Sequence, residues 1–590
     1  MMVKKLFLIC FVLLLIISPT WATNYYVDST CGEAGGDGTT TDCDGGADDV
    51  FVTLASAQAA ITGDQSDNSI LLARGSLFRE TFTFGANGTS GHQFTLSAYG
   101  AGDLPKIYGS TEISTWETTG SNLWTATSAA DPESLWFVNT DGSIVWGEDM
   151  AAATPDTEYQ WIYAGTTVTV YAATDPDSRY TSIEKPTRLQ SVNINGKSYV
   201  TISYLDISFN GAATSDEAAA IYQGPGPNPG TNGIIVEYNK THHNGKLSMS
   251  SPNGHQGQGI VLQNTSNSFI RYNETYFNGR RGISIWTNNA GRVMNNMTVD
   301  SNLVYDNSHA SIDVFWQTAG GTMDNIIIRN NRMYTTAAAG QGTSFQPGIH
   351  GINLESNSGQ QITNVKIHNN IIYDMDENVG IYIRGGGGVL ITNNTIYGSN
   401  NLSAQGYGPT GILVNDNKAA GNSDVSIYNN IVSSMGSTGR ALEIEVTGDI
   451  TACENNLWYN TGASVYVKIA STLYHSDDQA AYKSATGFDD TGLWEDPVFT
   501  TDGSDFTLQV TSPAIGAGVD LGNSLLYGLD PTSTWTGNVK PLDQDDYGAW
   551  EIGAYVYVEA GPPGGPGTIA GGGSGTIAGG GTGTIQGTEP

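Results

Sequence analysis

Two carboxylates, Asp313 and Glu355, are the residues of this sequence best placed to carry out a reaction. They lie in two similar apolar runs, Ser311–Phe315 and Gly351–Glu355. If these runs are adjacent parallel strands, a step of about 4.8 Å between strands and about 6.7 Å along one strand separate the two Cβ atoms by roughly 8 Å. Inverting glycosidases hold their two carboxylates about 6.5–9.5 Å apart, which leaves room for the attacking water. The spacing therefore predicts a glycoside hydrolase in which Asp313 and Glu355 divide the acid and base roles, without showing which residue takes which role.

Further polar and aromatic residues occupy the same rows of expected outward positions. Arg384 is expected beside Glu355 and completes the predicted catalytic set. We expect the aromatic residues to stack on sugar rings and the amides to hydrogen bond with sugar hydroxyls. The predicted substrate-binding residues are Trp286, Phe315, Asn353, Tyr382 and Asn415.

A second hypothesis is a polysaccharide lyase. β-Elimination from a uronic acid requires neutralisation of its carboxylate, often by Ca²⁺ bound to carboxylate oxygens, and a basic residue that takes the proton. No cofactor is certain from the sequence, but Asp313, Asn353 and Glu355 are a possible oxygen set for Ca²⁺. The groups available for positive charge or proton transfer are Arg280, Arg281, Arg384, His309 and His350.

A third hypothesis needs no catalytic residues. A non-catalytic adhesin, surface protein or carbohydrate-binding protein also accounts for an acidic, repetitive chain with a Gly-rich end. The expected partner in all three hypotheses is a polysaccharide or another glycan.

A returning Asn-Asn-x-x-Tyr phrase organises the segment that carries these residues. The second Asn recurs at steps of 34, 29, 29, 39, 24, 36 and 26 residues, so one structural unit repeats with insertions in its loops. Each unit contains short β-type runs with Gly and Asn at the corners, and no helical period. The recurring second Asn residues are Asn239, Asn273, Asn302, Asn331, Asn370, Asn394, Asn430 and Asn456.

The repeat assigns the side chains to faces, because neighbours along a strand alternate between the two sides. Three positions before each repeated Asn stands an apolar residue, such as Val236 or Ile270, or Cys453, and we expect these to point inward. We expect the Asn residues and the Tyr three positions later to form two ladders of stacked side chains. The outward column that precedes each repeated Asn begins with charges of alternating sign, from Glu237 to Arg329, which predicts salt bridges between coils.

Several segments resemble secreted pectate-lyase-like β-helix proteins. The resemblance rests on Tyr25–Asp28 with the Gly-rich loop that follows, on Thr53–Ile61, on Phe94–Tyr99 and on a terminal pattern of Ser512–Gly518 followed by Trp550–Tyr555. It covers most of residues 24–558 and implies an all-β fold, a single-stranded right-handed parallel β-helix of about ten or more coils. That superfamily is rich in polysaccharide lyases and glycoside hydrolases, but a fold does not by itself define a function.

Composition limits the partners. The chain has 58 acidic and 24 basic residues in 590, a formal net charge of −34. This charge argues against nucleic acid as a partner, which requires basic patches. It also weighs against long polyanionic substrates, unless metal ions mediate.

The N-terminus has the pattern of a secretory signal peptide over residues 1–22. Lys4 and Lys5 precede an apolar run, Leu6–Ile17, and Thr20–Ala22 is typical of a cleavage site. A secreted, extracellular protein is therefore expected, with no membrane span because no other apolar run approaches the required length. The sequence does not indicate an oligomeric state.

Two cysteines, Cys31 and Cys43, share one loop and are expected to form a disulfide in an oxidising compartment. Cys453 falls on an inward position, which predicts a buried free thiol.

The expected domain organisation follows the repeat. Residues 114–187 interrupt it with alternating strands and five tryptophans, which predicts a small β-rich insertion after the first coil, with the tryptophans in its core. The predicted segments are a signal peptide (1–22), a cap and first coil (23–113), the insertion (114–187), the parallel β-helix (188–470), C-terminal coils and a cap (471–558), and a flexible Gly-rich tail (559–590).

Overall fold

The computed structural model describes most of the chain between residues 22 and 559. The described residues are 22–33, 35–63, 65–211, 218–224, 230–247, 256–287, 291–318, 320–336, 348, 350–375, 379–398, 409–436, 438–460 and 465–559. The predicted signal peptide and nearly all of the predicted Gly-rich tail lie outside them. No helix in these ranges is both long enough and apolar enough to cross a membrane.

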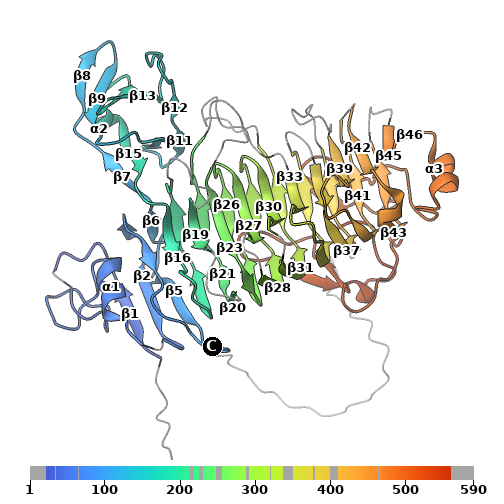
Figure 1. The fold of residues 1–590 in the computed structure, drawn as a ribbon, viewed down its shortest axis with the longest axis horizontal. Coiled ribbons are helices and arrows are strands. Elements are labelled where there is room, and N and C mark those ends of the chain that lie inside the picture. The colour runs from blue at the N-terminus through green and yellow to red at the C-terminus, as the bar shows by residue number, and fades with distance from the viewer. Residues whose placement is uncertain are drawn as a thin grey trace, which may run out of the picture. The chain divides into compact units, whose positions relative to one another are not determined.

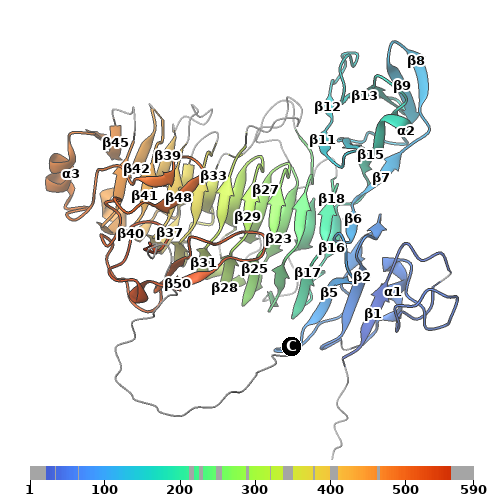
Figure 2. The ribbon, with the colours of Figure 1, turned by 180° about the vertical axis from the view of Figure 1, so that it is seen from behind.

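Three long sheets run along the molecule, and each coil supplies one strand to each sheet (Figures 1 and 2). The strand before each repeated Asn belongs to sheet 1, the strand after it to sheet 2, and the third strand of the coil to sheet 3. Pairing between coils is parallel in all three sheets, apart from the last strand of sheet 3. The prediction of a parallel β-helix is confirmed.

Sheet 1 consists, in order, of β1 (Asn24–Val27), β2 (Ser69–Ala73), β5 (Phe94–Tyr99), β17 (Val200–Ser203), β21 (Ile235–Glu237), β25 (Ser268–Arg271), β28 (Arg292–Asp300), β31 (Gly321–Arg329), β34 (Ile362–His368), β37 (Gly386–Thr392), β40 (Ser423–Tyr428) and β43 (Ile450–Glu454). Sheet 2 consists of β3 (Leu77–Phe78), β6 (Lys106–Tyr108), β18 (Asp206–Ser208), β22 (Lys240–His242), β26 (Glu274–Tyr276), β29 (Leu303–Tyr305), β32 (Arg332–Tyr334), β35 (Ile371–Tyr373), β38 (Thr395–Tyr397), β41 (Ile431–Ser433) and β44 (Leu457–Tyr459). Sheet 3 consists of β4 (Phe82–Thr83), β16 (Gln190–Asn193), β19 (Ala219–Gln223), β23 (Gln258–Gln263), β27 (Arg281–Thr287), β30 (Ala310–Trp316), β33 (His350–Ser356), β36 (Val379–Arg384), β39 (Thr410–Val414), β42 (Arg440–Ile444), β45 (Val465–Ile469) and β46 (Thr472–His475). A further parallel pair, β20 (Thr231–Asn232) and β24 (Thr265–Ser266), lies outside these sheets.

The repeated Asn residues form a buried ladder in the turn between sheets 1 and 2. The side-chain oxygen of Asn302 accepts bonds from the backbone N–H and the side-chain amide of Asn273, both at 3.0 Å. Asn302 in turn donates its own amide to Asn331 at 2.9 Å and to the backbone oxygen of Ile270. A second Asn ladder, which the sequence analysis missed, follows sheet 2 from Asn210 through Asn244, Asn278 and Asn307.

Asp489 ends the first Asn ladder. One of its oxygens accepts bonds from the backbone N–H and side-chain amide of Asn456, at 3.1 and 2.9 Å. The other oxygen accepts from the indole of Trp458, the hydroxyl of Tyr482 and the thiol of Cys453. Cys453 is a buried free thiol, as predicted.

Aromatic and charged ladders cover the outer surface beside this turn. The rings of Tyr276, Tyr305, Tyr334 and Tyr373 stack with centroids 4.9–5.0 Å apart, as predicted. The predicted salt bridges on sheet 1 also form, with Arg271 bonded to Glu237 at 2.6 Å and Arg329 bonded to Asp300 at 2.8 Å.

The N-terminal part contains a cap and the predicted insertion. Helix α1 (Leu54–Ala60), with Thr53 as its N-cap, covers the first coil, and Cys31 and Cys43 are joined by the predicted disulfide. Of the five tryptophans of the insertion, four are buried and Trp124 packs against the core, which confirms their structural role. The insertion contains β7 (Ser110–Ile113), β8 (Glu117–Gly120), β9 (Leu123–Thr127), β10 (Trp136–Asn139), β11 (Ile144–Trp146), β12 (Glu148–Asp149), β13 (Gln160–Ala164), β14 (Thr167–Tyr171), α2 (Pro176–Arg179) and β15 (Tyr180–Pro186).

The C-terminal part packs on the β-helix in two places. The sequence analysis expected only coils and an end cap. Helix α3 (Gln479–Thr486) packs its Tyr482 against the end of the core. Residues from 499 to 556 instead pack along the outer face of sheet 2, where Phe506, Leu529 and Ile552 contact Tyr373 and Ile431. This segment contains β47 (Phe499–Thr501), β48 (Asp505–Leu508), β49 (Tyr527–Leu529) and β50 (Pro541–Asp543).

Replacement of Asn302 with Ala is expected to lower the free energy of unfolding by about 3 kcal/mol, because buried donors and acceptors on Asn273 and Asn331 lose their partner. A suitable control is Asn296→Gly, which removes an exposed Asn that bonds to Asn267 and Asn325; its φ is 58°, and Gly adopts that conformation without strain. Urea unfolding followed by circular dichroism measures both changes. Equal losses in the two variants would contradict a dominant role for the buried ladder.

Candidate functional site

The strand register of sheet 3 brings the predicted site residues together. Asp313 lies opposite Asn353 on the next strand, which lies opposite Tyr382. In the neighbouring row, Phe315 lies opposite Glu355, which lies opposite Arg384. Trp286 of β27 lies opposite Phe315, so the site sits on four adjacent strands, β27, β30, β33 and β36.

Asn353 joins the two predicted carboxylates. Its side-chain amide donates to Asp313 Oδ1 at 2.7 Å and also bonds to Glu355. The second oxygen of Asp313 forms an ion pair with Arg281 at 2.9 Å, and Asp313 is completely buried. The residues thus form one polar network.

Glu355 is held between two cations at the other end of this network. Arg384 and Lys418 each approach one of its oxygens at 2.6 Å, and Asn357 donates to the same oxygen as Lys418. Burial alone would raise the pKa of Glu355, but Arg384 and Lys418 outweigh burial and the pKa is lowered. Glu355 is therefore a carboxylate at neutral pH.

His350 adds a neutral imidazole beside the network. It is 5% exposed, lies edge-on to the ring of Tyr382 at 5.3 Å and lies 5.9 Å from the ring of His309. Burial, followed by the nearby charge of Arg384, lowers the pKa of His350 to about 3. At neutral pH the ring is uncharged and one of its nitrogens has a free lone pair.

Several buried polar atoms on this face have no hydrogen-bond partner in the structure as described. They belong to side chains that are predicted to bind substrate or that lie beside those residues. Buried polar groups are normally paired. Such a cluster therefore either lowers the stability of the fold or marks a binding site. These atoms are Ser284 Oγ, Trp286 Nε1, His350 Nδ1, Asn353 Oδ1 and Arg384 Nε.

Aromatic rings lie beside these polar atoms. Trp286 and Phe315 face each other across neighbouring strands and are each partly exposed. The ring of Tyr382 is buried, and the Arg384 guanidinium lies over it at 4.5 Å. Asn415 donates its amide to Glu445 at 2.8 Å and not to the carboxylates of the network.

The arrangement does not fit a calcium ion. Arg281 lies on one oxygen of Asp313, and Arg384 and Lys418 lie on the oxygens of Glu355. A divalent cation at this place would face positive charge at short range. Elsewhere in the described residues, no group of three or more His, Cys, Asp or Glu side chains could hold a metal ion.

Lys418 is the residue that sequence reasoning missed. It follows β39 in a connecting segment, so no strand periodicity places it on the face. Arg281 was considered only as a source of positive charge. It starts β27 and aligns with Ala310 and His350 in a third row of the same face.

Replacement of His350 with Gln is expected to reduce the loss of stability in mild acid. In the unfolded chain a histidine takes up a proton below its ordinary pKa of 6.5, whereas folded His350 stays neutral down to about pH 3. The stability that this histidine confers is therefore present above 6.5 and is lost as the pH falls. Linkage gives a loss of about 2 kcal/mol between pH 7 and pH 5 that the variant should lack.

Urea unfolding at pH 7 and pH 5 measures this difference. His475→Gln is the control for a histidine substitution at an exposed position. The prediction is wrong if His350→Gln also behaves like the unmodified chain.

No protein-family model matches this sequence, and no curated protein matches it. Solved structures do resemble the chain. A GH136 lacto-N-biosidase from Eubacterium ramulus shares 14% identity over 76% of this chain and 67% of its own, with a TM-score of 0.39. Pectate lyase Pel9A shares 14% over 90% and 96%, with a TM-score of 0.45. PfbA, a surface adhesin of Streptococcus pneumoniae, shares 14% over 72% and 91%, with a TM-score of 0.40. These are likenesses of fold.

Proposed function

We propose that this protein binds a polysaccharide on the outer face of sheet 3 and hydrolyses it there, with Glu355 and Asp313 as the two carboxylates. The observation that carries the proposal is the group of buried polar atoms without partners beside partly exposed aromatic rings. A sugar ring presents hydroxyls at its edge and apolar C–H groups on its faces. It therefore suits both parts of this surface.

The two carboxylates receive different roles. Glu355 acts as the base that activates water, because its lowered pKa keeps it ionised. Asp313 is left with the acid role. Arg281 occupies one oxygen of Asp313, so that role requires saccharide binding to separate the two side chains.

Positive charge supports a lyase as the second candidate. Glu355 is shared by Arg384 and Lys418, and Glu443 on the same face is shared by Arg440 and Lys468. Each of these groups carries one surplus positive charge in a chain whose net charge is −34. In this alternative, Arg384 and Lys418 neutralise a uronic acid carboxylate, which is the first requirement of β-elimination.

Replacement of either carboxylate with its amide, Glu355→Gln or Asp313→Asn, is expected to lower hydrolysis at least about 100-fold, because each removes one proton-transfer group. The assay measures new reducing ends and ultraviolet absorbance of unsaturated products on a panel of plant and algal polysaccharides. Glu237→Gln removes another arginine-paired carboxylate, on sheet 1, and should retain full activity.

The same assay separates the alternatives. Reducing ends without absorbance indicate a hydrolase, and both together indicate a lyase. Neither product on any polysaccharide favours the binding protein. Full activity of Glu355→Gln or Asp313→Asn on a polysaccharide that the unmodified chain cleaves would exclude the proposed roles.

Trp286→Ala is expected to weaken polysaccharide binding about tenfold, because the variant loses a stacking surface. Phe269→Ala removes a ring that is 41% exposed on sheet 1 and is the matched control. Affinity electrophoresis in gels that contain the polysaccharide measures both. Equal retardation of the two variants would place the binding surface elsewhere.

A further inference from the structure

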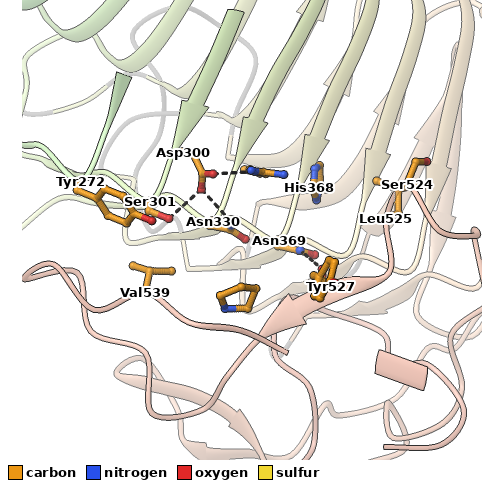
Figure 3. Close-up of a pocket in the computed structure, with 12 residues that line it drawn as sticks. Tyr272, Asp300, Ser301, Asn330, His368, Asn369, Ser524, Leu525, Tyr527 and Val539 are labelled. Carbon is orange, nitrogen blue, oxygen red and sulfur yellow. Dashed lines mark hydrogen bonds and ion pairs between the residues drawn. The ribbon is translucent and has the colours of Figure 1, made fainter. Parts of the chain in front are cut away.

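A pocket lies on sheet 1, away from the site on sheet 3. It is a cavity of about 310 Å³ between the outer edge of sheet 1 and the C-terminal segment. Figure 3 shows Tyr272, Asp300 and Ser301 on the sheet side, with Val539 and Tyr527 of the C-terminal segment opposite. This volume is at the lower end of the range of about 300–1,000 Å³ for small-molecule sites.

The pocket begins where a stack of tyrosines ends. Tyr204, Tyr238 and Tyr272 occupy equivalent positions on three consecutive coils and stack at 4.9 and 5.0 Å, nearly parallel. The equivalent position on the next coil is Ser301, and later coils have Asn there. Tyr272 therefore has no ring stacked on its far side, and the small side chain of Ser301 leaves the pocket in that place.

Asp300 provides a fixed acceptor in the pocket wall. Ser301 and Asn330 donate to its Oδ1 at 2.8 and 2.9 Å, and Arg329 Nε donates to Oδ2 at 2.8 Å. Because Arg329 balances the charge of Asp300, this wall has no net charge.

His368 contributes a buried ring nitrogen that has no hydrogen-bond partner among the described residues. The side chain lines the pocket and is 6% exposed, and its Nδ1 has no hydrogen-bond partner in the described part of the chain. Burial, followed by the charges of Arg329 and Lys366, lowers the pKa of His368 to about 3, so the ring is neutral at physiological pH.

The opposite wall is held in place by hydrogen bonds. The amide of Asn369 donates to the backbone oxygen of Tyr527 at 2.5 Å, and the indole of Trp535 donates to the backbone oxygen of Asn330 at 2.7 Å. The cavity is thus preformed, which reduces the entropy lost on binding.

We propose that this pocket binds one neutral pyranose residue, which stacks on the free face of Tyr272 and bonds through its hydroxyls to Asp300 and His368. An aromatic face next to a charge-balanced acceptor and an unpaired imidazole nitrogen is suited to a ring with apolar faces and hydroxyl edges. A uronic acid is disfavoured, because its carboxylate would meet that of Asp300. The pocket is independent of the proposed hydrolytic site and attaches the protein to a glycan whether or not sheet 3 cleaves it.

The test uses Ser301→Tyr in the full chain. Ser301 has a φ of 59°, and Tyr272 has a φ of 55° at the equivalent position, so the backbone accepts a tyrosine there. The new ring continues the stack on Tyr272 and fills the pocket. Ser301→Asn is the matched control, since Asn stands at this position on the next coil and is much smaller.

Saturation-transfer NMR measures binding of methyl β-D-glucoside, methyl β-D-galactoside, methyl α-D-mannoside and methyl β-D-xyloside, with D-galacturonate as the charged comparison. We expect at least one neutral glycoside to bind, and Ser301→Tyr to weaken that binding at least tenfold while Ser301→Asn retains it. The thermal unfolding midpoint of Ser301→Tyr should not fall. If it does fall, Tyr272→Asn replaces it as the test variant and should also abolish binding.

Three outcomes overturn the proposal. These are the absence of binding by all four neutral glycosides, binding that both pocket variants leave unchanged, and tighter binding of galacturonate than of any neutral glycoside. Polysaccharide cleavage by Ser301→Tyr is assayed in parallel. Absence of cleavage by the unmodified chain, together with glycoside binding, would concern the site on sheet 3 and not this pocket.

Discussion

The buried hydrogen bonds between consecutive Asn side chains are the constraint on which the rest of the structure depends. Each amide bonds to a backbone oxygen of the preceding coil and to the next member of the ladder, so every coil is held at the same height relative to its neighbour. A strand that slipped by one residue would break this ladder and reverse the faces of all its side chains. The rows on sheet 3 keep their register for this reason, although the connecting loops differ in length.

This constraint explains which parts of the molecule were predictable from sequence. The Asn residues and the stacked tyrosines recur at fixed offsets. The rows that contain Asp313 and Glu355 follow from the similar apolar runs of successive coils, and strand alternation then assigns the faces. Lys418 and the C-terminal segment have no such offset. Lys418 reaches Glu355 from a loop, and residues 499–556 pack on sheet 2 through contacts between distant parts of the chain, such as Phe506 with Tyr373. The lowered pKa of Glu355 likewise comes from Arg384, which the repeat places beside it, and from Lys418, which the repeat does not place.

The two candidate sites differ in how the scaffold creates them. On sheet 3, polar and aromatic side chains replace one another on successive coils, and several of their buried polar atoms have no partner among the described residues. On sheet 1, a regular stack stops at Tyr272 because the next coil has Ser301, and a small cavity results. In this repeat fold, variation along a row groups polar and aromatic side chains, and the interruption of a row leaves a pocket.

Asp489 has a consequence beyond closure of the core. Asp489 is fully buried, and Asn456, Trp458 and Tyr482 all donate hydrogen bonds to it, so an Asn at this position would place an N–H among donors. Asp489 accepts hydrogen bonds on both oxygens and has no N–H in its side chain to offer. The ladder of amides therefore ends inside the protein on a side chain that accepts, and its last amide keeps a hydrogen-bond partner.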